Sequence, residues 1–127
     1  MAKRITTYIP CNQCVLTVTG TSYGPADGQE GFFEWNPDSY DGIVAVYVEV
    51  VAYSDSTGCI PNQVAGVSWE LYDETNSTQI GSWSDSGSNW EVRRGSDVSG
   101  SMPASTATMR ISCKKLCGTN VQFRSTR

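Results

Sequence analysis

The segment from Gly31 to Tyr72 constrains the fold more strongly than any other part of this chain. It contains two long stretches rich in valine and aromatic residues, and turn-forming Asn, Pro, Asp and Gly lie between them. Neither stretch has the spacing of apolar positions that an amphipathic helix requires, whereas valine and aromatic side chains favour strands. The segment therefore predicts an all-β protein.

The remainder of the chain follows the same organisation. Apolar stretches recur every roughly 8–12 residues with turn clusters between them, which is typical of a sandwich or barrel. The length of 127 residues fits one domain, with residues 1–12 as an N-terminal arm and residues 13–127 as a single β-sandwich. We expect about eight or nine strands, at residues 6–9, 15–19, 31–35, 43–53, 64–72, 79–84, 90–94, 106–113 and 120–124.

Alternating side chains show which faces of these strands are apolar. Val67, Trp69 and Leu71 should point to the core, because successive strand residues face opposite sides. Ser68, Glu70 and Tyr72 should point the other way, to water. The stretch 43–53 differs, since both of its faces are apolar. One face carries alternating valines; the other is a candidate assembly face that a loop or another subunit would cover, made of Ile43, Ala45, Tyr47 and Val51.

Charge and hydropathy exclude several classes of partner. The formal net charge is −4, so nothing predicts a nucleic-acid interface, which normally requires a basic face. No apolar run approaches the roughly 18 residues that would span a bilayer. The basic start of the chain lacks the apolar segment of a secretory signal. We therefore expect a soluble protein with no signal peptide, no nucleic-acid partner and no membrane partner.

Nothing in the sequence predicts an enzyme. The chain has no histidine, so neither a Ser-His nor a Cys-His nucleophile can be assembled. Carboxylates are present, but no spacing singles out a pair for glycoside hydrolysis. No phosphate-binding loop or dinucleotide fingerprint occurs. No catalytic residue is predicted.

The five cysteines support three readings. Cys11 and Cys14 lie near the start of the domain, Cys113 and Cys117 near its end, and Cys59 in a loop. If the terminal strands are neighbours, the two pairs converge. They would then form one or two disulfides, a tetrahedral zinc site, or simply buried thiols. No other cofactor is indicated.

Two tryptophans flank a polar loop. Trp83 and Trp90 lie on either side of SDSGSN. Exposed indole rings can stack on sugars, which would support glycan binding. Alternatively, they cap the core or contribute to a subunit interface, where aromatic residues are enriched.

Two motifs and the C-terminal strands resemble a recurrent sandwich module. The first motif comprises Trp35, Asn36, Pro37, Tyr40, Asp41 and Gly42; the second comprises Leu71, Tyr72, Asp73 and Thr75. Together with TATMRISC and VQFRS, they resemble the antiparallel jelly-roll-like β-sandwich of phage virion proteins, which is related to carbohydrate-binding sandwiches.

The resemblance implies a non-enzymatic virion structural protein at the particle surface, either a capsid decoration or accessory protein or a tail or fibre module. Its partners would be other virion proteins or copies of itself. The alternatives are a carbohydrate-binding module, whose partner is a glycan, and a subunit of a non-viral surface filament. Sandwich folds host many functions, so oligomeric state is the property that separates these alternatives.

Overall fold

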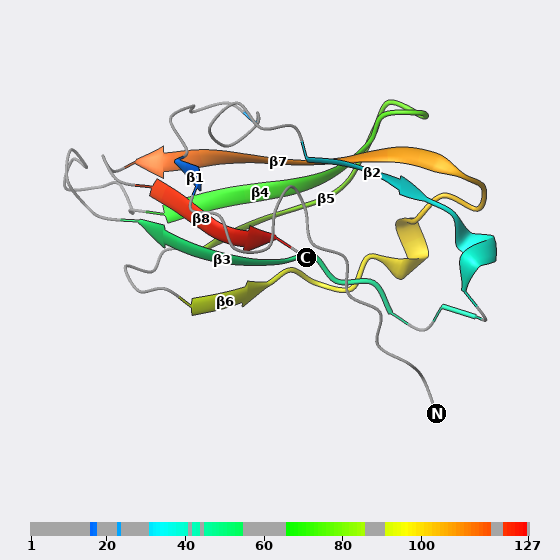
Figure 1. The fold of residues 1–127 in the computed structure, drawn as a ribbon, viewed down its shortest axis with the longest axis horizontal. Helices are drawn as coiled ribbons and strands as arrows, with labels where there is room; N and C mark the ends of the chain where they lie inside the picture. Colours follow the sequence, from blue (N-terminus) through cyan, green and yellow to red (C-terminus); the bar gives the residue numbers. More distant parts are fainter. Residues whose placement is uncertain are drawn as a thin grey trace.

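The protein is all-β, and its described residues form two antiparallel four-stranded sheets (Figure 1). The computed structural model describes residues 16–17, 23, 31–40, 42–43, 45–54, 66–85, 91–117 and 121–126. Among these residues there is no α-helix, and the only helical turns are η1 (Pro37–Ser39) and η2 (Ser99–Ser101). The predicted N-terminal arm and the predicted strand at residues 6–9 lie outside this part of the chain.

Each sheet combines strands from both halves of the chain. Sheet A has the order β1-β8-β3-β6, with β1 (Leu16–Thr17), β8 (Val121–Thr126), β3 (Glu49–Ser54) and β6 (Glu91–Arg94). Sheet B has the order β2-β7-β4-β5, with β2 (Gly31–Trp35), β7 (Ala107–Cys117), β4 (Gly66–Asp73) and β5 (Thr78–Asp85). All the strand pairs are antiparallel.

The strand pairs are nested within one another along the chain. The hairpin β4–β5 lies innermost, and the pairs β3–β6, β2–β7 and β1–β8 enclose it in turn. The successive pairs alternate between the two sheets, so the first and last described strands end up as neighbours. This arrangement depends on pairings that are distant in sequence.

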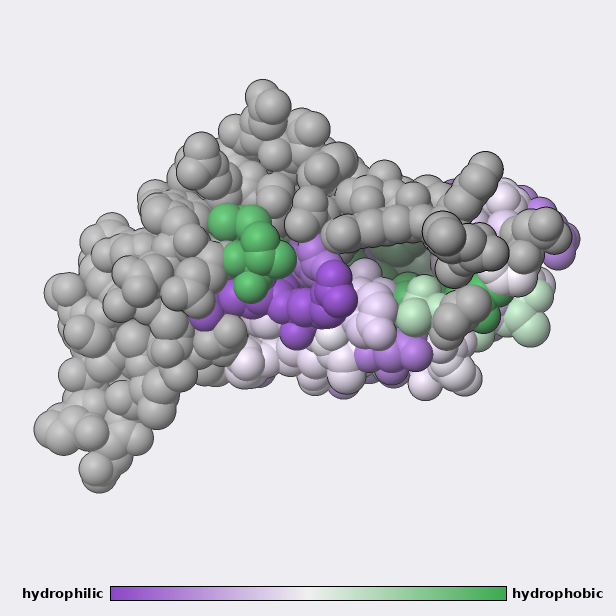
Figure 2. Space-filling view, turned by 90° about the horizontal axis from the view of Figure 1, so that it is seen from below, coloured by the Kyte–Doolittle hydropathy of each residue, from purple (hydrophilic) through white to green (hydrophobic). Residues whose placement is uncertain are grey.

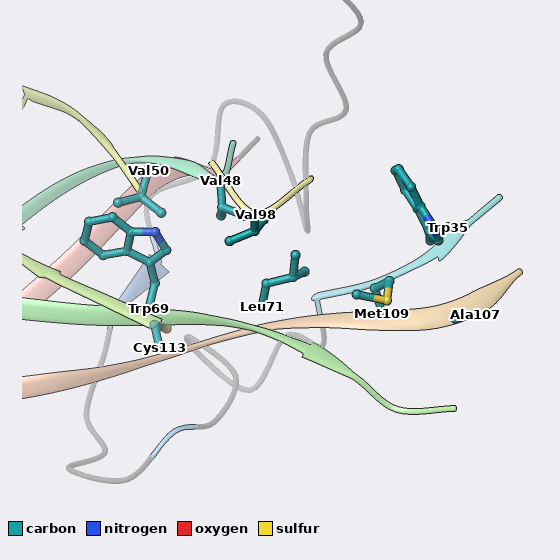
Figure 3. Packing of buried hydrophobic residues seen from close by; sticks show 9 residues of the cluster. All are labelled: Trp35, Val48, Val50, Trp69, Leu71, Val98, Ala107, Met109 and Cys113. Carbon is teal, nitrogen blue, oxygen red and sulfur yellow. The ribbon is translucent and has the colours of Figure 1, made fainter. Parts of the chain in front are cut away.

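The core lies between the sheets, and Trp69 of β4 fills one end of it (Figure 3). The indole points from sheet B toward Val50 of β3 in sheet A, and Leu71 and Met109 extend the apolar layer away from it. All four side chains are almost completely buried. The predicted inward positions of Trp69 and Leu71 are therefore confirmed. The full buried apolar cluster is Trp35, Val48, Val50, Trp69, Leu71, Val98, Ala107, Met109 and Cys113.

The predicted outward position of Glu70 holds, but the expectation that it meets water is wrong. Glu70 lies on the outer face of sheet B and is nevertheless buried, as is Ser68 on the same strand. The Glu70 carboxylate accepts a hydrogen bond of 2.7 Å from Gln79 Nε2, and Arg110 Nη2 lies 3.7 Å from it. Neighbouring polar side chains thus replace water around this carboxylate, which alternation alone cannot reveal.

Only the second half of the predicted strand 43–53 forms a regular β-strand. The β-ladder of β3 begins at Glu49, and the segment before it runs beside residues 95–98 instead. Gly95 N donates to Val48 O and Val98 N donates to Val46 O, both at 2.9 Å. Between these two bonds one segment advances by two residues (48 to 46) and the other by three (95 to 98). This unequal step prevents a regular ladder. The valines still face inward, since Val48 is buried and Val46 is partly buried.

Local turn chemistry follows the sequence closely. Pro37 begins η1, and the side chain of Asn36 accepts a hydrogen bond from Asp38 N at 3.0 Å. The rings of Trp35 and Tyr40 stack across this turn with centroids 5.4 Å apart. In the β4–β5 hairpin, the carboxylate of Asp73 accepts from Asn76 N at 3.0 Å and from Asn76 Nδ2 at 2.6 Å.

We expect Trp69→Ala to lower the free energy of unfolding by about 3–5 kcal/mol, because it removes the largest fully buried side chain of the described residues and leaves a cavity. Ser82→Ala is the matched control, since Ser82 is exposed on β5 and surface substitutions usually change stability by less than about 0.5 kcal/mol. Urea melts measure both variants. Equal losses of stability in the two variants would show that Trp69 contributes no more to the core than an exposed serine does.

Candidate interaction surfaces

The predicted assembly face lies on the outside of sheet A. Ile43 and Tyr47 are 38% and 43% exposed, Ala45 is exposed and Val51 is partly buried. These side chains alternate with the valines that face the core, as the sequence pattern predicts. The structure therefore presents large apolar groups to the exterior along one segment, which is the property expected of an interface.

Strand β6 adds further groups to this face. Val92 is the most exposed large hydrophobic side chain among the described residues, at 56%. Arg94 stacks over the ring of Tyr47, with Cζ 4.7 Å from the centroid, and its Nε donates to Glu49 Oε1 at 2.7 Å. Figure 2, which views the molecule from the side on which β6 lies in Figure 1, shows strongly hydrophilic side chains gathered beside hydrophobic ones. We call Ile43, Ala45, Tyr47, Val51, Val92 and Arg94 the sheet A surface.

An exposed aspartate holds the irregular segment of this surface in place. Asp97 Oδ1 accepts hydrogen bonds from Val46 N and Ser99 N, both at 2.9 Å, and Oδ2 accepts from Ser99 Oγ at 3.1 Å. These bonds, the one from Val46 foremost, lower the pKa of the Asp97 carboxyl below its ordinary value of 3.8. Asp97 therefore substitutes for the ladder where the strand is interrupted.

A second polar surface lies on the outside of sheet B. Strand register places Phe32 of β2, Arg110 of β7, Tyr72 of β4 and Gln79 of β5 in one row across the sheet. Arg110 Cζ lies 4.8 Å from the centroid of the Tyr72 ring, and its Nη1 lies 2.8 Å from Glu74 Oε1. Phe32, at the end of the row, is 48% exposed. We call these four residues the sheet B row.

Trp83 lies at the margin between the sheets. It is partly buried and packs against the core, with its ring centroid 6.2 Å from that of Trp69. A Cβ added at Gly81 or Gly95 would come within 2.7 or 2.5 Å of its ring, so the indole fits only between glycines. Its Nε1 donates to Ser96 Oγ at 2.9 Å. This position corresponds to the packing alternative for Trp83, and Trp90 lies outside the described residues.

The cysteine cluster remains a prediction. The side chains of Cys11, Cys14, Cys59 and Cys117 lie outside the described part of the structure. Cys113 faces the core, opposite Trp69 in the pairing of β7 with β4. Burial raises the pKa of its thiol to about 12. Among the described side chains no group of three or more Cys, Asp or Glu residues is arranged to hold a metal ion.

No family model matches the chain, and no curated protein or solved structure matches it either. In the described residues no helix is long and apolar enough to cross a membrane. The two surfaces and the fold are therefore the features of the molecule that bear on its function.

Sequence reasoning located the apolar side of residues 43–51 but missed several contributors. Val92 and Arg94 were expected only as strand residues, and the sheet B row was not foreseen. Alternation could have placed Phe32, Arg110 and Tyr72 on outward faces. It could not have placed them in one row with Gln79, since that requires the register of three strand pairs.

We expect Asp97→Ala to lower the urea midpoint at pH 7, because it removes the acceptor for Val46 N and Ser99 N. Since the folded-state pKa is lowered, the carboxylate stabilises the fold above pH 3.8, and this contribution is lost as the pH falls through the lower folded value. The difference from wild type should therefore shrink in acid.

Asp38→Ala, at an exposed aspartate of η1, is the matched control and should leave the midpoint unchanged. The measurement is a series of urea melts from pH 7 to pH 2. A wild-type midpoint in Asp97→Ala at pH 7 would contradict the role assigned to this carboxylate.

Proposed function

We propose that this protein is a non-enzymatic structural subunit of a virion, either a capsid decoration or accessory protein or a tail or fibre module at the particle surface. The observation that carries the proposal is the sheet A surface, where Ile43, Tyr47 and Val92 expose large apolar side chains beside Arg94. Aromatic residues and arginine are enriched in protein interfaces. This combination suits permanent contact with another subunit.

The nested strand pairing supports assigning the fold to the jelly rolls. Eight strands paired first with last, and so on inward, correspond to a long antiparallel ribbon wrapped into two facing sheets. Jelly rolls serve in viral capsids and in lectins. Because one fold hosts many functions, the strand order is compatible with the proposal and the exposed surface distinguishes it from others.

A structural role also accounts for the charged groups on sheet B. Glu70 is buried and its carboxylate is matched by Arg110 and Gln79. A catalytic carboxylate would need access to substrate, and the chain contains no histidine to act with it. These groups therefore support a protein that binds and assembles without turnover.

The partner of the sheet A surface would be another virion protein or a second copy of this chain. Light scattering and native mass spectrometry should find wild-type protein in an oligomer, or bound to particles. Tyr47→Ser should weaken that association, because it removes an exposed ring and its contact with Arg94. Deleting residues 1–9 tests the alternative that the N-terminal arm carries assembly.

Ser82→Ala, on the exposed side of sheet B, should assemble like wild type. A wild-type protein that remains monomeric at high concentration and binds no particle would exclude the structural role.

A carbohydrate-binding module is the second candidate, favoured by the sheet B row. Phe32 offers an exposed ring for the apolar face of a sugar, and Gln79 with the Arg110–Glu74 pair offers donors and acceptors for its hydroxyl groups. With Glu70 and Glu74 both beside Arg110, the row carries no excess positive charge, so a neutral sugar fits it better than an anionic one.

Under this alternative, a panel of neutral oligosaccharides should contain at least one that binds the wild-type protein, and Phe32→Ala should abolish that binding. Trp83→Phe is the comparison, since Trp83 packs between the sheets and should not contact a sugar. Binding lost in Trp83→Phe but retained in Phe32→Ala would move the sugar site to the SDSGSN loop.

A further inference from the structure

Strand β6 forms one edge of sheet A in the described part of the chain (Figure 1). Its outward side chains are well exposed, at 56% for Val92 and 51% for Arg94. An edge strand presents unpaired backbone groups to which another strand can add. The strand adjoins the sheet A surface, since Arg94 stacks on Tyr47.

The direction of the backbone groups on β6 follows from the hydrogen bonds to its neighbour. Gly95 N donates to Val48 O, so these two residues form a hydrogen-bonded pair. Hydrogen-bonded and non-hydrogen-bonded pairs alternate along antiparallel strands, and β6 continues in the same register with Arg93 opposite Val50. Arg93 therefore bonds to β3, while Val92 and Arg94 direct their N–H and C=O groups away from it.

These outward groups suit a second copy of the same strand. In a sheet continued across a twofold axis, directly opposed side chains must lie on the same face. One residue of the strand must therefore lie opposite its own copy, with the axis midway between the two. An axis at Glu91, Arg93 or Arg94 would set like charges opposite each other, which destabilises a strand pair. An axis at Val92 sets Val92 against its own copy and places Glu91 opposite Arg93 in register.

We infer that β6 pairs antiparallel with β6 of a second copy of this chain, about a twofold axis through Val92. The inference rests on the proposed function, because it names the partner that contacts β6 at the margin of the sheet A surface. The two Val92 residues exchange both backbone hydrogen bonds, and their exposed side chains lie together on the outer face. Sheet A thereby becomes one continuous eight-stranded sheet.

The size of the contact sets the strength of association. A four-residue edge buries far less than the roughly 1,200–2,000 Å² of a stable interface. The dimer should therefore depend on concentration and should strengthen where a particle holds two copies side by side. Sedimentation over a wide concentration range should reveal a reversible monomer–dimer equilibrium.

Val92→Pro tests the pairing directly. Proline is tolerated on edge strands when its missing N–H faces outward, so β6 should remain paired with β3 while the second copy is blocked. We expect dimerisation to be lost with an unchanged circular dichroism spectrum. Val92→Thr, which keeps the N–H and the β-branched shape, is the matched control and should still dimerise.

A cysteine at the axis tests the register. Opposed Cα atoms of a hydrogen-bonded pair lie about 5.5 Å apart, within the range of a disulfide. Val92→Cys should therefore form a covalent dimer on mild oxidation, with the 92–92 link identified by peptide mapping. In Arg94→Cys the two cysteines would be offset by four residues, about 14 Å along the strands, and should not join. Wild-type protein treated in parallel accounts for the native cysteines.

The outcomes separate this inference from the proposed function. If Tyr47→Ser disrupts an oligomer that Val92→Pro leaves intact, assembly uses the outer face and the edge pairing is wrong, while the structural role stands. If Val92→Pro fails to fold, the cross-link decides: no 92–92 disulfide in a dimerising sample overturns the pairing. If the wild-type protein neither dimerises nor binds particles, both ideas fail.

Discussion

The packing of Trp69 between the two sheets is the interaction on which the rest of the structure depends. Its ring points from β4 toward Val50 on β3 and is almost completely buried (Figure 3). Its Nε1 has no hydrogen-bond partner within the described residues, which costs about 1–3 kcal/mol. Burying an aromatic surface of roughly 150–250 Å² stabilises the fold by about 4–6 kcal/mol. The apolar term therefore outweighs the unpaired donor, and the indole holds the sheets together.

The aromatic packing around Trp69 continues to the edge of the molecule near β6. Trp83 extends the aromatic layer from Trp69 toward β6, and it fits because Gly81 and Gly95 leave room for its ring. Next to it, the ladder between residues 45–48 and 95–98 is irregular, and Asp97 supplies hydrogen bonds in its place. Trp83 and Asp97 thus close one side of the sandwich. Because the regular ladder ends there, β6 remains a short edge strand.

Both outer faces bury a carboxylate, Glu70 on sheet B and Glu49 on sheet A, but they expose different side chains. On sheet B, buried Glu70 is matched by Arg110 and Gln79, and a charge can lie there because its partners compensate for lost water. On sheet A, Glu49 is buried against Arg94 in the same way, while Tyr47 and Val92 remain exposed beside this pair. Buried polar networks specify internal structure, whereas exposed apolar groups are available for contacts with other molecules. We therefore propose that assembly uses sheet A, with the sheet B row as the surface for the alternative, sugar-binding function.

The sequence by itself determined the all-β class, the inward face of β4 and the two local turns. Each depends on neighbours along the chain: alternation places Trp69 inside, Pro37 begins η1, and Asp73 caps its own hairpin. These features need no knowledge of distant strands. The expectation that Glu70 meets water failed because its surroundings come from β5 and β7.

Only the tertiary structure decided the strand order, the edge position of β6 and the row from Phe32 to Gln79. Each depends on register between strands that are far apart in sequence. Residue periodicity carries no information on which strands pair, because many pairings would bury the same apolar faces. The choice among them is made by the fit of the whole core around Trp69.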